Sequence, residues 1–139
     1  MELVVAAILT IVADQASKMF VLTRFAEGQF SSSTFLIRIR RVTNPKGSIV
    51  FVHKRAVLLG LWGLAVLSTI LAIRFGHFFA TPAAQLGLGL ALGGATSNLW
   101  DMLQRHGVID FIDMRLWPVF NLADVAIFIG SAVALWFAF

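Results

Sequence analysis

Stretches of mostly apolar residues divide the chain, and each is close to the length of about 20 residues that a helix needs to cross a bilayer. They cover residues 3–21, 56–73, 82–103 and 120–139. The second stretch carries no charge, whereas the other three contain acidic side chains. The pattern predicts an all-α membrane protein in which residues 1–139 form a single domain with four transmembrane helices.

The connection between the first two stretches has a different pattern. Apolar and basic residues alternate from Phe35 to Arg40, as they do in a strand with one polar face. The segment Asn44–Gly47 indicates a turn, and Ser48–Phe51 a second short strand. We therefore expect a small extramembrane β-sheet over residues 30–51, between helices 1 and 2. The segment 111–119 is expected to return along the membrane interface into the fourth helix.

Composition supports a membrane location. The chain has 139 residues, of which 59% are hydrophobic and 13% are charged, against about 45–50% and about 25% in soluble domains. In so apolar a chain the net charge of +4 favours contact with anionic lipid headgroups over nucleic acid. The first apolar stretch runs directly into Asp14 and Lys18, so we expect a retained helix and not a cleaved signal peptide.

Metal and thiol chemistry find no support in the sequence. The chain contains no cysteine, which excludes disulfides, thiolate metal sites and a cysteine nucleophile. His53, His77 and His106 lack the spacing of metal ligands. We therefore expect neither a metal site nor a metallopeptidase.

Polar residues inside the apolar stretches are functional candidates, because a charge in a transmembrane helix costs at least about 2.5–3.5 kcal/mol. Within each helix they are spaced to share one face: Asp14 with Lys18, Asn98 with Asp101, and Asn121 with Asp124. Adjacent helices run antiparallel, so these pairs lie at the same side of the membrane, together with Asp110 in the last connection. One polar cluster below one membrane surface is expected.

Five short motifs follow one another between residues 14 and 124. They are Asp14-Gln15-Ala16-Ser17-Lys18, Asn44-Pro45-Lys46-Gly47 with Phe51, Gly93 to Asp101, Gly107 to Ile112, and Phe120-Asn121-Leu122-Ala123-Asp124. In this order they resemble the D-Q-x-x-K, N-x-G-x-A-F, G-G-x-x-G-N-x-x-D-R, G-x-V-x-D-F and F-N-x-A-D motifs of lipoprotein signal peptidases (signal peptidase II). The chain resembles a divergent member of that family.

The resemblance implies a membrane aspartic endopeptidase that removes signal peptides from prolipoproteins by cleaving before the lipid-modified cysteine. Asp110 and Asp124 would be the catalytic pair, since two close carboxylates share one proton and provide an acid and a base. No cofactor is implied. The residues with supporting roles would be Asp14, Lys18, Asn44, Gly47, Asn98, Asp101 and Asn121.

The resemblance also implies a setting and partners. The protein would be a monomer in the bacterial cytoplasmic (inner) membrane, with its active site near the outer surface, and would contact membrane lipids and globomycin-type inhibitors. Seven Lys and Arg residues in the connection between helices 1 and 2 would place that connection in the cytoplasm by the positive-inside rule. We follow the family, because a folded β insert can bind lipid headgroups for its own reasons.

Three departures from the family motifs leave an alternative open. Ser97 replaces a glycine, a change expected only to alter helix approach, and Met102 replaces the arginine after Asp101. The spacing from Asn44 to Gly47 is one residue longer. Arg105 is one turn from Asp101 and could substitute as its partner. The alternative is a catalytically impaired relative that binds lipidated peptides or lipids.

Structural roles could also explain several of the polar residues. Asp124 alone could stabilise a helix N-terminus, and Asp110 alone could be a solvated loop residue. Asp113 is the alternative to Asp110 as a catalytic residue, and we expect it to be solvated or to have a supporting role. Asp14 with Lys18 is expected to form an internal ion pair.

Two further expectations concern the helices. Asn98 with Asp101 could be interhelical hydrogen-bonding groups, and Gly87, Gly89, Gly93 and Gly94 are expected to allow close packing.

A proton or ion conductor is a third class of function, but the carboxylates of such a protein should be distributed across the membrane and not gather at one side.

Overall fold

The computed structural model describes residues 1–31, 37–44, 51–75 and 79–138. In chain order, its helices and strands are α1 (Glu2–Arg24), β1 (Arg38–Asn44), α2 (Phe51–Phe75), α3 (Pro82–Gln104), β2 (Val108–Asp113) and α4 (Leu122–Trp136). The four predicted helices are present, with ends that differ from the predicted ones by up to five residues.

Crossing a membrane is a stricter condition than being helical. By length and composition alone, α1 is the one helix in the described part of the chain that is long and apolar enough to span. Shorter apolar segments cover Leu59–Phe75 in α2 and Leu122–Trp136 in α4. Four crossings therefore stay a prediction.

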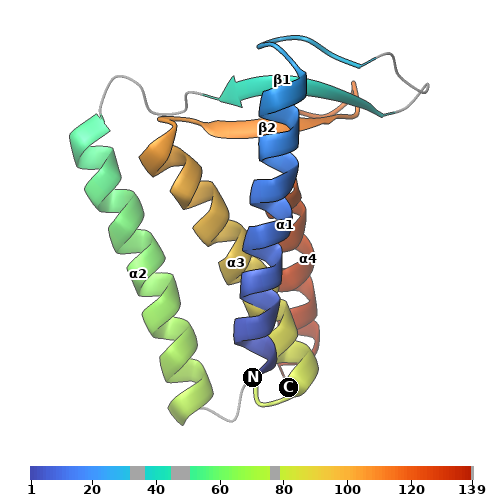
Figure 1. Ribbon diagram of the computed structural model, residues 1–139. Helices are drawn as coiled ribbons and strands as arrows, with labels where there is room; N and C mark the ends of the chain where they lie inside the picture. The colour runs from blue at the N-terminus through green and yellow to red at the C-terminus, as the bar shows by residue number, and fades with distance from the viewer. Residues whose placement is uncertain (32–36, 45–50, 76–78, 139) are drawn as a thin grey trace.

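Helix α3 packs closely between α1 and α4, while α2 stands beside it (Figure 1). Glycine makes this approach possible. A Cβ added to Gly130 in α4 would lie 2.5 Å from the carbonyl oxygen of Gly87 in α3, and one added to Gly89 would lie 2.3 Å from the carbonyl oxygen of Leu3 in α1. The prediction that the α3 glycines allow close packing is confirmed.

The sheet differs from the predicted one. Strand β1 pairs antiparallel with β2, which comes from the connection between α3 and α4, and the register places Val42 opposite Asp110 and Arg38 opposite Asp113. The prediction that the whole sheet lies within residues 30–51 is therefore wrong, because the strand that pairs with β1 comes from the connection between α3 and α4. Phe51 begins α2, and residues 32–36 and 45–50, which include Gly47 and most of the predicted turn, lie outside the described residues.

The segment expected to return along the interface begins inside β2. Alternation within a segment shows that it can form a strand but not which strand it pairs with, because register depends on contacts distant in the sequence. The sheet lies across the end of the helices opposite the two termini (Figure 1). It therefore brings Asn44 and Asp110 to the end of α3 and the start of α4.

We expect Gly130→Ala to destabilise the protein by about 1–3 kcal/mol, the usual cost of overpacking, because the new Cβ meets backbone atoms of α3. Gly63→Ala is the matched control in α2, since a Cβ there has nothing within 4 Å. Thermal unfolding of both variants in detergent, followed by circular dichroism, measures the difference. Equal melting temperatures would contradict close α3–α4 packing.

Candidate active site

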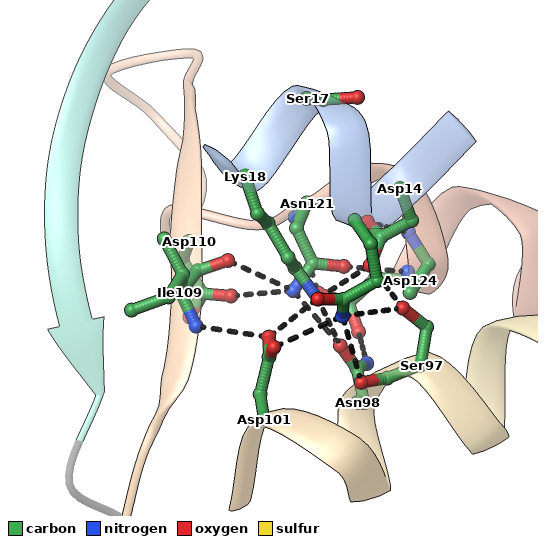
Figure 2. A network of polar contacts seen from close by, with 12 residues as sticks. Asp14, Ser17, Lys18, Ser97, Asn98, Asp101, Ile109, Asp110, Asn121 and Asp124 are labelled. Carbon is green, nitrogen blue, oxygen red and sulfur yellow. Dashed lines mark hydrogen bonds and ion pairs between the residues drawn. The ribbon is translucent and has the colours of Figure 1, made fainter. Parts of the chain in front are cut away.

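The ammonium group of Lys18 is buried where α1, α3 and α4 meet (Figure 2). Its Nζ lies 2.5 Å from Oδ2 of Asp14 and 2.7 Å from Oδ2 of Asp101, and it donates a hydrogen bond to Oδ1 of Asn98 at 2.9 Å. The side chains of Lys18, Asp14 and Asp101 are 0% exposed. The predicted ion pair between Asp14 and Lys18 is confirmed, and Asp101 extends it to α3.

A second cation completes the charge balance of this cluster. Arg105 Nη1 pairs with Oδ1 of Asp101, as expected from their i,i+4 spacing, and also donates to Oε1 of Gln15 at 3.0 Å. Gln15 Nε2 donates to the same Asp101 oxygen at 3.0 Å. Two carboxylates thus face two cations, which is the condition under which buried charges are tolerated.

Ser97 takes part in this network, although the replacement of a glycine by this serine predicts only a change in helix approach. Its hydroxyl donates to Oδ2 of Asp14 at 2.7 Å and accepts a hydrogen bond from Gln15 Nε2 at 2.8 Å. The other Asp14 oxygen accepts from the backbone N–H of Ala123 at 2.9 Å. Asp14 therefore joins α1, α3 and α4. The only available signal was a hydroxyl in place of the expected glycine.

Asn121 joins the start of α4 to β2. It is the N-cap of α4: its Oδ1 accepts from the N–H of Asp124 at 2.9 Å, and Oδ2 of Asp124 accepts from the N–H of Asn121 at 3.3 Å. Because Oδ1 is used by the cap, Nδ2 faces the other way and donates to Oδ1 of Asp110 at 2.8 Å and to Oδ1 of Asn98 at 3.1 Å. One side chain thus fixes both candidate aspartates.

Asp110 and Asp124 line the same cavity, which has a volume of about 130 Å³. Asn98 Nδ2 donates to Oδ1 of Asp124 at 2.9 Å, and Asn44 Nδ2 lies 3.4 Å from Oδ2 of Asp110. Asp110 is only 5% exposed, whereas Asp124 is half-buried. The other residues that line the cavity are Met102 and Val108.

The environment of Asp110 favours its protonated form. Burial raises the pKa of Asp110, and the nearby charge of Asp124 raises it further, while hydrogen bonds from Asn44 and Asn121 and the charge of Lys18 partly offset the rise. A buried carboxyl beside a second carboxylate is an arrangement in which one proton is retained. Asp110 is therefore not the solvated loop residue that it could have been.

Asp113 has a different environment, although it is on the same strand. It is 3% exposed and accepts hydrogen bonds from the N–H of Arg115 at 2.8 Å and from Nε of Arg38 at 2.6 Å. These contacts lower the pKa of Asp113. Of the two roles expected for Asp113, the solvated one is wrong, because the residue is buried with Arg38 as its partner across the sheet. The supporting role stays a prediction.

The last of the candidate residues is Gly47. Gly47 lies outside the described residues. Among the residues that the structure describes, no group of three or more histidine and acidic side chains could hold a metal ion.

Comparisons with known proteins agree on one family. The sequence profile described as Signal peptidase (SPase) II matches residues 6–139. The lipoprotein signal peptidase of Moorella thermoacetica is 35% identical over 98% of this chain and 91% of its own length. That of Syntrophomonas wolfei is 34% identical over 92% and 86%.

A solved structure has the same fold. It is that of a bacterial membrane enzyme determined by the in meso method at 1.9 Å resolution, and it aligns with a TM-score of 0.79. The alignment covers 96% of this chain and 89% of that one, at 20% sequence identity. At this identity the likeness establishes the fold alone.

We expect Lys18→Met to destabilise the protein by about 3–5 kcal/mol, because two buried carboxylates lose their shared partner. Arg24→Met is the matched control on the same helix. Arg24 is exposed and lies over the ring of Phe20, a contact worth about 0.5–1 kcal/mol. Unfolding by denaturant measures both. If Lys18→Met lowers the free energy of unfolding by no more than Arg24→Met does, a structural role of the buried ion cluster is contradicted.

We expect Asp110→Asn to raise the melting temperature at neutral pH. A carboxyl whose pKa is raised by folding destabilises the folded state once it ionises. The gain in melting temperature should shrink as pH falls through the raised pKa of Asp110, and it should vanish below the pKa of an unfolded aspartate, about 3.9. Asp113→Asn should lower the melting temperature at neutral pH. The lowered pKa of Asp113 means that its ionised carboxylate stabilises the fold until acid protonates this side chain. Two melting series against pH test both signs, and a fall in stability for Asp110→Asn would be the contrary result.

Proposed function

The chain belongs to the signal peptidase II family, and from this premise we propose that it cleaves prolipoproteins immediately before the lipid-modified cysteine, with Asp110 and Asp124 as its catalytic pair. It is an aspartic endopeptidase of the signal peptidase II type that processes the signal peptides of prolipoproteins. The observation that carries the proposal is that Asp110 and Asp124 line one cavity in unequal environments.

The two environments support different roles. Asp110 is the acid, because burial and the neighbouring charge raise its pKa. Asp124 is the base: it is half-buried, its carboxylate accepts from Asn98, and it lies in the first turn of α4, where the helix dipole favours negative charge. A cavity of about 130 Å³ has room for a water and a carbonyl group, since a water takes about 30 Å³ in the liquid.

In the proposed reaction the water oxygen attacks the carbonyl carbon of the scissile bond. Asp124 accepts a proton from the water, and Asp110 gives its proton to the carbonyl oxygen, so that a neutral tetrahedral diol forms. Asp124 then passes its proton to the departing nitrogen while Asp110 takes one back from a diol hydroxyl. The C–N bond breaks, leaving a new carboxyl group and the free amine of the cysteine.

The remaining polar residues are proposed to hold this pair in place. Asn44, Asn98 and Asn121 contact the two aspartates directly. Asp14, Lys18 and Asp101 form the buried ion cluster behind them and position the helices. A supporting role for Gly47 rests on the motif alone.

We further propose the setting of the enzyme. It is a membrane enzyme by its family, and the proposal adds four crossings of the bacterial inner membrane by a monomer whose active site lies near the outer surface, in contact with lipids and inhibited by globomycin-type peptides. Two basic residues of the insert have roles within the fold. Arg38 pairs with Asp113 at 2.6 Å, and Arg41 donates to the carbonyl of Phe25 at 2.9 Å, so these two charges have partners within the fold.

The decisive experiment is a cleavage assay with a diacylglyceryl-modified prolipoprotein and purified enzyme. We expect Asp110→Asn and Asp124→Asn each to lower kcat/KM by about 10²–10⁴-fold, the usual contribution of a general acid or base. Asp113→Asn, three residues from Asp110 and outside the cavity, should retain activity at a temperature below its melting point.

Two results would count against the proposal. Undiminished cleavage by either dyad variant would remove that aspartate from the reaction. Globomycin binding by a wild-type protein that cleaves nothing would favour the alternative of a non-catalytic relative.

A further inference from the structure

The cavity that holds the two aspartates shares a wall with a second cavity. The second has a volume of about 290 Å³ and lies between α2 and α3. Asn98 and Met102 line both cavities. The other residues around the second cavity are Leu61, Trp62, Ala65, Ala95 and Leu99.

The few polar atoms around the second cavity already have partners. Trp62 Nε1 donates to Oγ1 of Thr96 at 3.0 Å, and the amide of Asn98 is hydrogen-bonded to Asp124 and Lys18. Cavities without free polar groups bind apolar molecules: one of about 150 Å³ lined by aliphatic and aromatic side chains accepts benzene. The second cavity is larger than that, so it suits an apolar group of considerable size.

The arrangement of its residues indicates an elongated group. On α3 the lining runs from Ala95 to Met102, which corresponds to about 10 Å along the helix axis at 1.5 Å per residue. The cavity therefore extends lengthwise from the active site along α2 and α3. An alkyl chain fits this shape better than a compact side chain of a peptide.

Met102 stands where the polar and the apolar cavity meet. Its side chain is uncharged, unbranched and flexible, so it can adjust to a chain that passes beside it. A cation here would lie beside the two aspartates and would place a charge at the edge of the apolar cavity. The ion cluster does not need one, because Arg105 supplies the second cation to Asp101.

We propose that Met102 is a specificity-determining residue, and that the cavity between α2 and α3 binds an acyl chain of the lipid-modified cysteine. This inference rests on the proposed function. The bond to be cut lies at the aspartates, and the acyl chain of the adjacent cysteine enters the second cavity beside Met102. An uncharged residue at position 102 thus makes catalysis depend on acyl-chain length.

The test compares prolipoprotein peptides whose cysteine carries either palmitoyl or hexanoyl chains. For each variant the quantity is the ratio of kcat/KM for the long-chain substrate to kcat/KM for the short-chain one. We expect Met102→Arg and Ala95→Leu each to lower this ratio about tenfold, as when about two methylene groups no longer reach apolar surroundings. Ala95→Leu fills the cavity without adding charge, so it remains informative if Met102→Arg fails to fold.

Matched controls come from positions outside both cavities. Gln104→Arg adds the same charge at the exposed end of α3, and Ala56→Leu adds the same bulk on exposed α2. Both should keep the wild-type ratio.

The outcomes separate this inference from the proposed function. Cleavage with an unchanged ratio in both cavity variants would overturn the inference and leave the peptidase intact. A variant that alters preference among peptide side chains but not among acyl chains would also overturn it. Failure of the wild type to cleave either substrate would overturn both.

Discussion

The fold depends on the burial of the Lys18 ammonium group at the junction of three helices. A charge without exposure to solvent is tolerated only when partners surround it, and here Asp14, Asp101 and Asn98 do so. These partners are on α1 and α3, and Asp14 also binds the backbone of α4. The helices must therefore approach closely, and that requirement explains the glycines whose missing side chains bring α3 against α1 and α4.

The same network determines the geometry of the candidate active site. Asn98 contacts Lys18 on one side and Asp124 on the other, so the buried ion cluster and the cavity share a side chain. Asn121 caps α4 and binds Asp110 with the same amide. The positions of the two aspartates thus follow from how α3, α4 and β2 are joined. The environments of the two aspartates differ in exposure to solvent, since Asp110 is more deeply buried than Asp124.

Much of this could be predicted from the sequence, because the relevant signals are local. Apolar runs mark the helices, and antiparallel helices bring Asp14, Asp101 and Asp124 to one end. The motifs then single out Asp110. Strand pairing is not local: the partner of β1 lies about 70 residues further on, so Arg38 and Asp113 are recognised as a pair only when the register is known. Ser97 was underestimated for a similar reason, since a buried hydroxyl has a role only through the acceptor that it faces.

Met102 and Arg105 show that the pairing of the buried charges and the polarity of the wall between the two cavities depend on different residues at the end of α3. The sequence resembles a family with a cation directly after the aspartate at position 101, whereas here the cation that pairs with Asp101 comes one turn later. Position 105 serves the ion cluster because it lies one turn after Asp101 and shares a helix face with that carboxylate. Of these two positions, only 102 lies in the wall between the two cavities, where it stands with Asn98. Moving the cation along the helix therefore keeps the buried charges paired and leaves an apolar surface beside the aspartates, where a lipid chain can lie.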